Sequence, residues 1–259
     1  MAQFLSDLAY GDDHRQRLDL YLPERSDPRL FVFIHGGGWR GGSKDEYRAL
    51  GELLVQFGYA VALPNHRLAP QHPYPAAAED IAAALGWLCR SAPESGIRTQ
   101  GIILAGHSSG AHLAALVALH PRLRALAGLA PSAFAGVIGI SGIYDIEASA
   151  AASPEYLGPV FGDAPGTWAD ASPLRHARAG AAPFLLAHAE FDYPGAAGQA
   201  AAMAQALDRA GGAADVVAVP GRDHVTILSG VRSLFDPLAM RMAIFLRAVQ
   251  AGGGGSEAP

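Results

Sequence analysis

A serine flanked by glycines is the first candidate for chemistry in this sequence. Ser108 lies in Gly-His-Ser-Ser-Gly at residues 106–110, after an apolar run at 101–105 and before a helix-forming run at 111–119. A strand, a tight turn and a helix are the context that gives a G-x-S-x-G motif its meaning, because the turn lifts the serine to the carboxyl end of the strand and the positive end of the helix. The pattern predicts a nucleophile, although so short a motif also arises by chance in a chain with 31 glycines.

A serine nucleophile needs a base, and a histidine held by a carboxylate is the usual solution. Asp192 follows an apolar run at 183–189, and His224 follows another at 215–219. The order Ser, Asp, His is the one found with this type of serine turn. All three residues lie at predicted carboxyl ends of strands, where open α/β sheets place their sites. We predict that Ser108, Asp192 and His224 form a catalytic triad.

Other residues compete for these roles. Glu190 is the main rival acid, since it lies only two residues before Asp192. Asp223 adjoins His224, and direct sequence neighbours rarely orient each other's side chains as a triad requires. Three further histidines flank the motifs and are interpreted as structural residues that hydrogen-bond loops together: His35, His107 and His112.

A second motif, His-Gly-Gly-Gly-Trp at residues 35–39, follows the continuous apolar run 30–34. Three consecutive glycines are costly to order, so they suit a place where backbone N–H groups must face a ligand without side chains in the way. We predict that the amides of Gly37 and Gly38, with that of Ser109, form an oxyanion hole. Gly36 is a weaker candidate, and the alternative interpretation is a flexible glycine turn.

The rest of the chain alternates between strand and helix patterns. Strands are expected at residues 16–22, 30–34, 59–63, 101–105, 136–141, 183–189 and 215–219, and helices at 45–57, 76–89, 111–119, 196–210 and 237–249. This alternation predicts an α/β fold with a mostly parallel central sheet flanked by helices. We expect one domain over residues 1–251 and a flexible glycine-rich tail, native or an expression remnant, over 252–259.

Residues 143–182 are weakly patterned and long for a loop, which predicts a small lid-like or substrate-binding insertion before the acid-bearing strand. Its aromatic side chains either line an acyl or aryl pocket or pack the insertion onto the domain. The insertion's aromatic residues are Tyr144, Tyr156, Phe161 and Trp168. The predicted substrate-binding residues are Trp39, Tyr144, Phe161 and Trp168.

Composition excludes several classes of function. Half of the residues are hydrophobic and 17% are charged, which favours a large core over disorder. A net charge of −5 and the lack of a Lys/Arg run argue against nucleic-acid binding. The first ten residues do not resemble a signal peptide and no apolar run is long enough to span a membrane, so we expect a cytoplasmic protein with no membrane partner. The sequence has neither metal-ligand spacing nor a nucleotide-binding glycine motif, so we expect no metal and no cofactor.

Three motifs together resemble the α/β-hydrolase esterase/lipase superfamily: residues 35–39, Asn-His-Arg-Leu-Ala-Pro at 65–70, and 106–114. The resemblance runs from about Leu18 to Phe245 and is strongest to the kynurenine formamidase-like carboxylesterases. His107 and Ala111 depart from the Asp and Gly that are usual in hormone-sensitive-lipase-type esterases, whereas formamidases often have a bulkier residue at the position of Gly38. Within the second motif, Arg67 is expected to form a salt bridge with Asp80 of the following helix.

The resemblance implies hydrolysis through an acyl-enzyme, without a cofactor, of a small-molecule ester or formamide. The first hypothesis is a carboxylesterase for short-chain or aryl esters. The second is an arylformamidase acting on N-formylkynurenine, which chain-length preference would distinguish because a formyl group needs little pocket volume. The third is a non-catalytic binding protein with the same fold, which would normally lack a triad member. The oligomeric state stays open, with a homodimer as one option.

Overall fold

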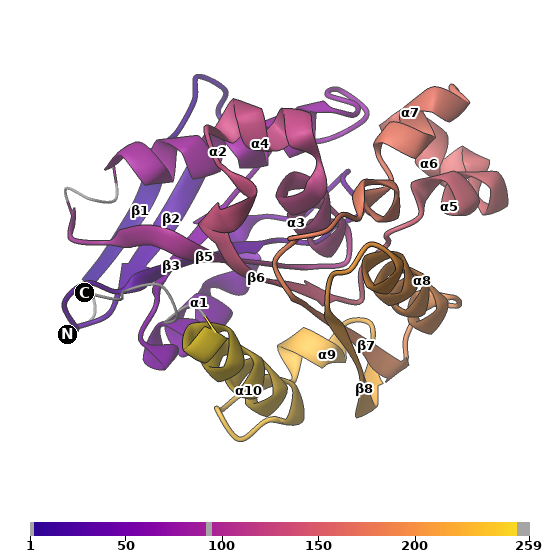
Figure 1. Cartoon of the computed structure of the whole chain (residues 1–259). Coiled ribbons are helices and arrows are strands. Elements are labelled where there is room, and N and C mark those ends of the chain that lie inside the picture. The colour runs from indigo at the N-terminus through magenta and orange to yellow at the C-terminus, as the bar shows by residue number, and fades with distance from the viewer. Residues whose placement is uncertain (1–2, 92–94, 253–259) are drawn as a thin grey trace.

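The computed structural model describes residues 3–91 and 95–252 of the chain. Within these ranges, eight strands form one sheet in the order β1-β2-β4-β3-β5-β6-β7-β8 (Figure 1). The strands are β1 (Gln3–Ala9), β2 (Arg17–Leu22), β3 (Arg29–Ile34), β4 (Ala60–Pro64), β5 (Arg98–His107), β6 (Phe134–Ile140), β7 (Phe184–Phe191) and β8 (Ala214–Asp223). β2 pairs antiparallel with β1 and β4, and the other neighbouring strands pair in parallel. The predicted mostly parallel sheet is confirmed.

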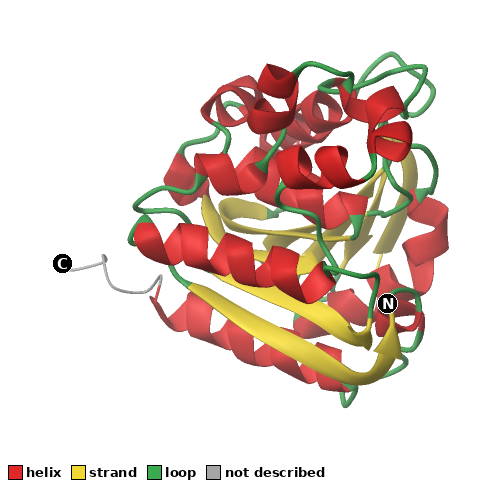
Figure 2. Cartoon of the chain, turned by 90° about the vertical axis from the view of Figure 1, so that its right-hand side faces the viewer, coloured by secondary structure: helices red, strands yellow, loops and turns green. Residues whose placement is uncertain are grey.

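Helices cover both faces of this sheet (Figures 1 and 2). One face carries α2 (Ala76–Ser91), α3 (Ser109–Leu119), α4 (Pro121–Ala127) and α8 (Ala196–Arg209). The other face carries α1 (Arg48–Leu54), α9 (Thr226–Ser229) and α10 (Pro237–Gly252). Each face encloses its own apolar core.

The central strands are apolar because both of their faces are buried. Along β3, Val32 and Ile34 pack into the core under α2 and α3, whereas Phe31 and Phe33 pack into the core under α1 and α10. This alternation is the period of two that a strand imposes on its side chains. A run with no polar position is therefore what a strand in the middle of this sheet requires.

Some elements were not expected from the sequence. β1 lies at the sheet edge and exposes five of its seven residues, so it has no apolar pattern. The helix expected at residues 45–57 is divided into α1 and two flanking 3₁₀ turns, Lys44–Tyr47 and Val55–Phe57. α10 continues to Gly252, and residues 253–259 of the expected tail lie outside the described residues.

The insertion at residues 143–182 is helical. It contains α5 (Ile146–Ala152), α6 (Pro154–Phe161), α7 (Pro165–Asp170) and a 3₁₀ turn, Pro173–His176, with α5 to α7 grouped together in Figure 1. None of the helices in the described ranges combines the length and apolar character needed to cross a bilayer.

Candidate active site

Ser108 occupies a sharp turn between β5 and α3. Its backbone has φ 55° and ψ −120°, a conformation that L residues rarely adopt. The two glycines of the motif make the turn possible, since a Cβ on Gly106 would lie 2.3 Å from the Gly110 oxygen and one on Gly110 would lie 2.2 Å from the Ile34 oxygen. The Ser108 amide donates to the Ile140 carbonyl at 2.8 Å, which ties the turn to β6.

Ser108, His224 and Asp192 lie in hydrogen-bonding contact. The Ser108 hydroxyl is 3.1 Å from His224 Nε2, and His224 Nδ1 is 2.6 Å from Asp192 Oδ1. Asp192 follows β7 directly and His224 follows β8 directly, and the last residues of these two strands, Phe191 and Asp223, are paired in the sheet. The topology therefore brings together side chains from three separate strand ends.

The Asp192 side chain is 4% exposed and accepts four hydrogen bonds. Its Oδ1 accepts from His224 and from the Tyr193 amide, and its Oδ2 accepts from the Ser141 hydroxyl at 2.5 Å and the Ala189 amide at 2.9 Å. Burial alone would raise the pKa of Asp192, but these hydrogen bonds outweigh it and hold the pKa well below its ordinary range. The carboxylate is therefore ionised and fixed in orientation at neutral pH.

The rival acids are engaged elsewhere. Glu190 is exposed and accepts from the Gly221 amide at 2.8 Å. Asp223 is also exposed and accepts from the amides of Val225 and Thr226 at the start of α9. The carboxylate that hydrogen-bonds to the His224 ring is that of Asp192.

The glycine turn after β3 faces Ser108. Gly37 and Gly38 both have positive φ, at 124° and 59°, and a Cβ on Gly37 would lie 2.2 Å from the Gly41 oxygen. The Gly36 amide donates to the Tyr47 hydroxyl at 3.0 Å, so it is not available to a substrate oxygen. Ser109 is the first residue of α3, and its amide has no acceptor within the helix. These positions are those of the predicted oxyanion hole.

A cleft of about 740 Å³ opens over Ser108. The glycine turn and Ser108 form one part of its lining, and apolar side chains of α1, α9 and the following loop form another, including Leu50, Leu228 and Val231. Glu46 and Arg232 also line it, so the cleft combines an apolar wall with two charged groups. A volume of this size lies in the range of small-molecule sites.

Comparison with known proteins places this arrangement in a family. The family model described as BD-FAE matches residues 18–207, which include Ser108 and Asp192 but not His224. The chain belongs to the BD-FAE family. The resemblance to the α/β-hydrolase carboxylesterases is thereby confirmed.

Individual relatives agree with this assignment. Esterase LipC of Mycobacterium tuberculosis is 31% identical over 262 aligned residues, covering 93% of this chain and 64% of LipC. Kynurenine formamidase of Danio rerio is 31% identical over 157 residues, covering 57% of this chain and 48% of that protein. The BD-FAE chain therefore spans about half to two thirds of the length of these relatives.

A solved structure shares the fold. The crystal structure of Esterase B from Lactobacillus Rhamnosis (HN001) superimposes with a TM-score of 0.81 at 22% identity, covering 96% of this chain and 85% of that one. The predicted α/β-hydrolase fold is confirmed by this likeness.

The predicted substrate-binding aromatics need correction. Tyr144 and Phe161 are 1% and 2% exposed and lie outside the lining of the cleft, as does Trp168, whose Nε1 donates to the Gly162 carbonyl. Of the four predicted residues, Trp39 lines the cleft, although it is only 2% exposed and its Nε1 donates to His112 Nδ1. Apolar packing of the insertion onto the domain, the alternative interpretation, accounts for the other three.

Tyr156 is the aromatic residue of the insertion that lines the cleft, where Ile143 also lies. Tyr156 lies on α6 and is 49% exposed, and a Cβ on Gly38 would lie 2.0 Å from its hydroxyl. The helical spacing of the sequence indicates this exposure of Tyr156. Leu157, Val160 and Phe161 form the apolar stripe of α6, and Tyr156 lies outside that stripe. Tyr47, which binds the Gly36 amide, and Ser141, which binds Asp192, were also missed.

The other histidines near the motifs have structural contacts. His112 accepts from Trp39 at Nδ1 and donates to the Ala171 carbonyl at 2.8 Å, and so ties the insertion to α3. His35 and His66 are buried and stack with ring centroids 4.4 Å apart. Burial lowers the pKa of His66 and of His112 to about 4 and that of His35 well below its ordinary value. These rings are neutral at pH 7.

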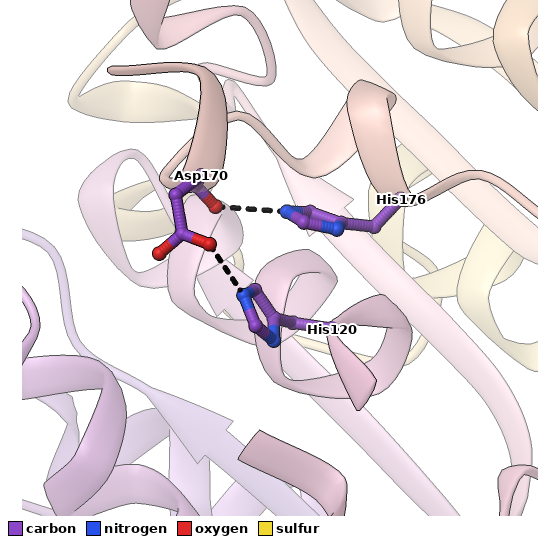
Figure 3. Close-up of side chains that lie close together, drawn as sticks. All are labelled: His120, Asp170 and His176. Atoms are coloured by element: carbon purple, nitrogen blue, oxygen red, sulfur yellow. Dashed lines mark hydrogen bonds and ion pairs between the residues drawn. The ribbon is translucent and has the colours of Figure 1, made fainter. Parts of the chain in front are cut away.

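One group of side chains has the composition of a metal site: His120, Asp170 and His176 (Figure 3). Hydrogen bonds already use both ring nitrogens of His120, both carboxylate oxygens of Asp170 and Nε2 of His176. His120 Nε2 donates to Asp170 Oδ1 at 2.9 Å, and His120 Nδ1 accepts the Arg122 amide at the start of α4. His176 Nε2 donates to the Asp170 carbonyl at 2.8 Å, while the Tyr74 hydroxyl donates to Asp170 Oδ2 at 2.6 Å.

A metal at His120 Nε2 would require a proton on Nδ1, and that proton would face the Arg122 amide and break the cap of α4. The three side chains are therefore better suited to anchoring α7 and the following 3₁₀ turn to the end of α3. The predicted salt bridge between Arg67 and Asp80 is present, at 2.7 Å.

Proposed function

We propose that this BD-FAE chain is a serine hydrolase that cleaves short-chain or aryl carboxylic esters through an acyl-enzyme on Ser108. The observation that carries the proposal is the pair of contacts made by His224, 3.1 Å from the serine hydroxyl and 2.6 Å from Asp192. His224 thus has a proton acceptor facing the nucleophile and a carboxylate that stabilises the imidazolium after transfer.

In the first half-reaction, the Ser108 oxygen attacks the ester carbonyl while His224 Nε2 accepts the serine proton. The carbonyl oxygen becomes an oxyanion that the amides of Gly37, Gly38 and Ser109 stabilise. His224 then gives its proton to the alkoxy oxygen, and the alcohol leaves. The acyl group remains bonded to Ser108.

In the second half-reaction, His224 accepts a proton from water, and the hydroxyl oxygen attacks the acyl carbonyl. The tetrahedral intermediate forms over the same amides and collapses when His224 returns the proton to Ser108. Acid is released and the enzyme is regenerated. The apolar wall of the cleft, including Leu50 and Leu228, would hold the hydrocarbon part of the substrate.

Arylformamidase activity is the second candidate. The likeness to the kynurenine formamidase of Danio rerio supports it, and the same three residues would attack a formamide. A cleft of about 740 Å³ would hold either substrate, with the formyl group of a formamide occupying little of it and the leaving group most of the rest, so acyl-length preference is the property that distinguishes the two. A cytoplasmic location and a homodimer stay predictions.

The test is hydrolysis of nitrophenyl esters of increasing acyl length, compared with N-formyl-L-kynurenine, by the chain and by Ser108→Ala. Ester turnover that peaks at short acyl chains and is lost in the variant supports the esterase. Efficient deformylation with weak ester turnover favours the formamidase. Failure of a fluorophosphonate probe to label Ser108, with no turnover of either substrate, would support a binding protein instead.

A further inference from the structure

His107, the residue before the nucleophile, contacts the loop that carries the predicted base. Its ring is 8% exposed and lies 4.8 Å from the His224 ring, centroid to centroid. His107 Nε2 is 2.9 Å from the main-chain carbonyl of His224. A carbonyl oxygen only accepts, so Nε2 carries the proton and the neutral ring has its lone pair on Nδ1.

The lone pair of His107 faces the hydroxyl of Tyr47, 3.4 Å from Nδ1. The same hydroxyl oxygen accepts the Gly36 amide at 3.0 Å. The three hydrogen bonds therefore point the same way along this chain. The Gly36 N–H donates to the Tyr47 hydroxyl oxygen, the Tyr47 O–H donates to His107 Nδ1, and the His107 Nε2–H donates to the His224 carbonyl. One chain of hydrogen bonds links the glycine turn after β3 to the loop after β8.

A neutral His107 keeps all the donors of this hydrogen-bond chain pointing one way. A proton on Nδ1 would require the Tyr47 hydroxyl to turn its hydrogen away and accept instead, which reverses this link. Burial, reinforced by the nearby His224, lowers the pKa of His107 to about 4. His107 is therefore neutral at pH 7 and adds no second positive charge when His224 accepts the serine proton.

We propose that His107 is a positioning residue: its N–H to the His224 carbonyl holds the base over Ser108, and its contact with Tyr47 couples the base to the glycine turn. This inference rests on the proposed function, since it needs His224 to act as the base. It assigns a role to a motif position that the G-x-S-x-G pattern leaves free.

The central variant is His107→Leu, which has a similar size and no donor. Without this hydrogen bond the His224 ring is held less firmly over Ser108, and kcat for ester hydrolysis falls by roughly 10- to 100-fold, since small misplacements of a catalytic group lower the rate by about this factor. His107 is part of the cleft lining, but leucine fills a similar volume there, so KM changes less than kcat. His107→Gln restores an N–H near the His224 carbonyl and recovers most of kcat, which a purely space-filling role does not predict.

Tyr47→Phe provides a second measurement that does not depend on His107→Leu folding. It removes one hydroxyl and lowers kcat by less than His107→Leu does. In the double variant Tyr47→Phe/His107→Leu, the fall in kcat is smaller than the product of the two single falls, because both residues belong to one chain of hydrogen bonds.

The matched control is His120→Leu. His120 is also buried, with both ring nitrogens hydrogen-bonded, but it lies beyond the far end of α3, about 16 Å along the helix. It lowers the melting temperature and leaves kcat unchanged.

The inference is overturned if folded His107→Leu keeps the kcat of the wild type, if His107→Gln is no better than His107→Leu, or if Tyr47→Phe and His107→Leu lower kcat independently. Failure of the proposed function has a different signature, since the wild-type chain then neither hydrolyses esters nor reacts with a fluorophosphonate.

Discussion

Asp192→Asn tests the proposed charge arrangement of the site most directly. The carboxylate accepts two hydrogen bonds on each oxygen, whereas an asparagine amide offers one oxygen and one NH₂ group. If the amide oxygen keeps the contacts with Ser141 and Ala189, the NH₂ group faces His224 Nδ1. His224 then adopts the tautomer with its proton on Nε2, which cannot accept the proton of Ser108.

The expected loss follows from two contributions. Returning His224 to the active tautomer sets its N–H against the amide N–H, and leaving buried donors unsatisfied costs about 2–3 kcal/mol. The imidazolium formed during the reaction also loses a charge-assisted hydrogen bond of 2.6 Å, worth about 3 kcal/mol. The sum of about 5–6 kcal/mol corresponds to a roughly 10⁴-fold fall in kcat, since each 1.36 kcal/mol is about tenfold.

The assay is steady-state hydrolysis of nitrophenyl acetate at pH 7–8, with Glu190→Gln as the matched control. Glu190 is two residues away and binds only the Gly221 amide, so the same change of acid to amide there leaves kcat within about twofold. The reasoning is refuted if Asp192→Asn stays within tenfold of the wild type, or if Glu190→Gln is the more damaging change.

Three further predictions concern the pH stability, the glycine turn and a buried ion pair. The pKa values of His66, His107 and His112 fall from 6.5 to about 4 on folding, so the unfolded chain takes up protons at these residues before the folded chain does. The folding stability that is present above pH 6.5 is therefore lost as the pH falls towards 4. The loss is about 3 kcal/mol for each histidine. A total of about 10 kcal/mol rivals the stability of a typical domain, so circular dichroism should show cooperative unfolding between pH 6 and 4, and a fully folded chain at pH 3.5 would contradict this. Gly38→Ala forces a positive φ on an L residue and should lower kcat roughly 10²- to 10³-fold by displacing an amide of the proposed oxyanion hole. Gly41→Ala is the control and should leave kcat unchanged, because a Cβ there lies 3.7 Å from its nearest neighbour. Equal activities of the two variants would remove Gly38 from the proposed site. Arg67→Ala leaves the 1% exposed carboxylate of Asp80 without its cation and should lower the free energy of unfolding by about 3–5 kcal/mol. If calorimetry finds the melting temperature lowered by less than about 3 °C, the ion pair contributes little to stability.

The sequence predicted elements where burial leaves a pattern. β3 and β4 are covered on both faces, so they consist of apolar runs that are easy to recognise. β1 has no such pattern, because it lies at an edge and points most of its side chains to solvent. Its pairing with β2 depends on backbone hydrogen bonds, which side-chain periodicity does not record.

The proximity of Ser108, Asp192 and His224 is predictable from the sequence, because each follows a strand and parallel strands bring their carboxyl ends to one edge of the sheet. The sequence does not separate Asp192 from Glu190 by position, since both lie near the end of β7. The structure distinguishes them by where the chain leaves the sheet: β7 ends at Phe191, and the turn that follows directs Asp192 toward His224.

The pocket was the least predictable part. Aromatic composition cannot distinguish a side chain that lines a cleft from one that fills a core. It therefore predicts Tyr144 and Phe161 in the pocket, whereas both are buried in the core. The helical stripe of α6 was the better guide, because it separates Phe161 from the cleft-lining Tyr156.

The backbone of Ser108 has a consequence for how this protein can be evolved or engineered. A residue other than glycine at φ 55° and ψ −120° stores on the order of 1–3 kcal/mol of strain, and a glycine at the same place would release it. The most heat-resistant version of the chain and its working version are therefore expected to differ at the proposed nucleophile. A library ranked by melting temperature alone would enrich Ser108→Gly and lose activity, so selection for stability has to be accompanied by selection for turnover.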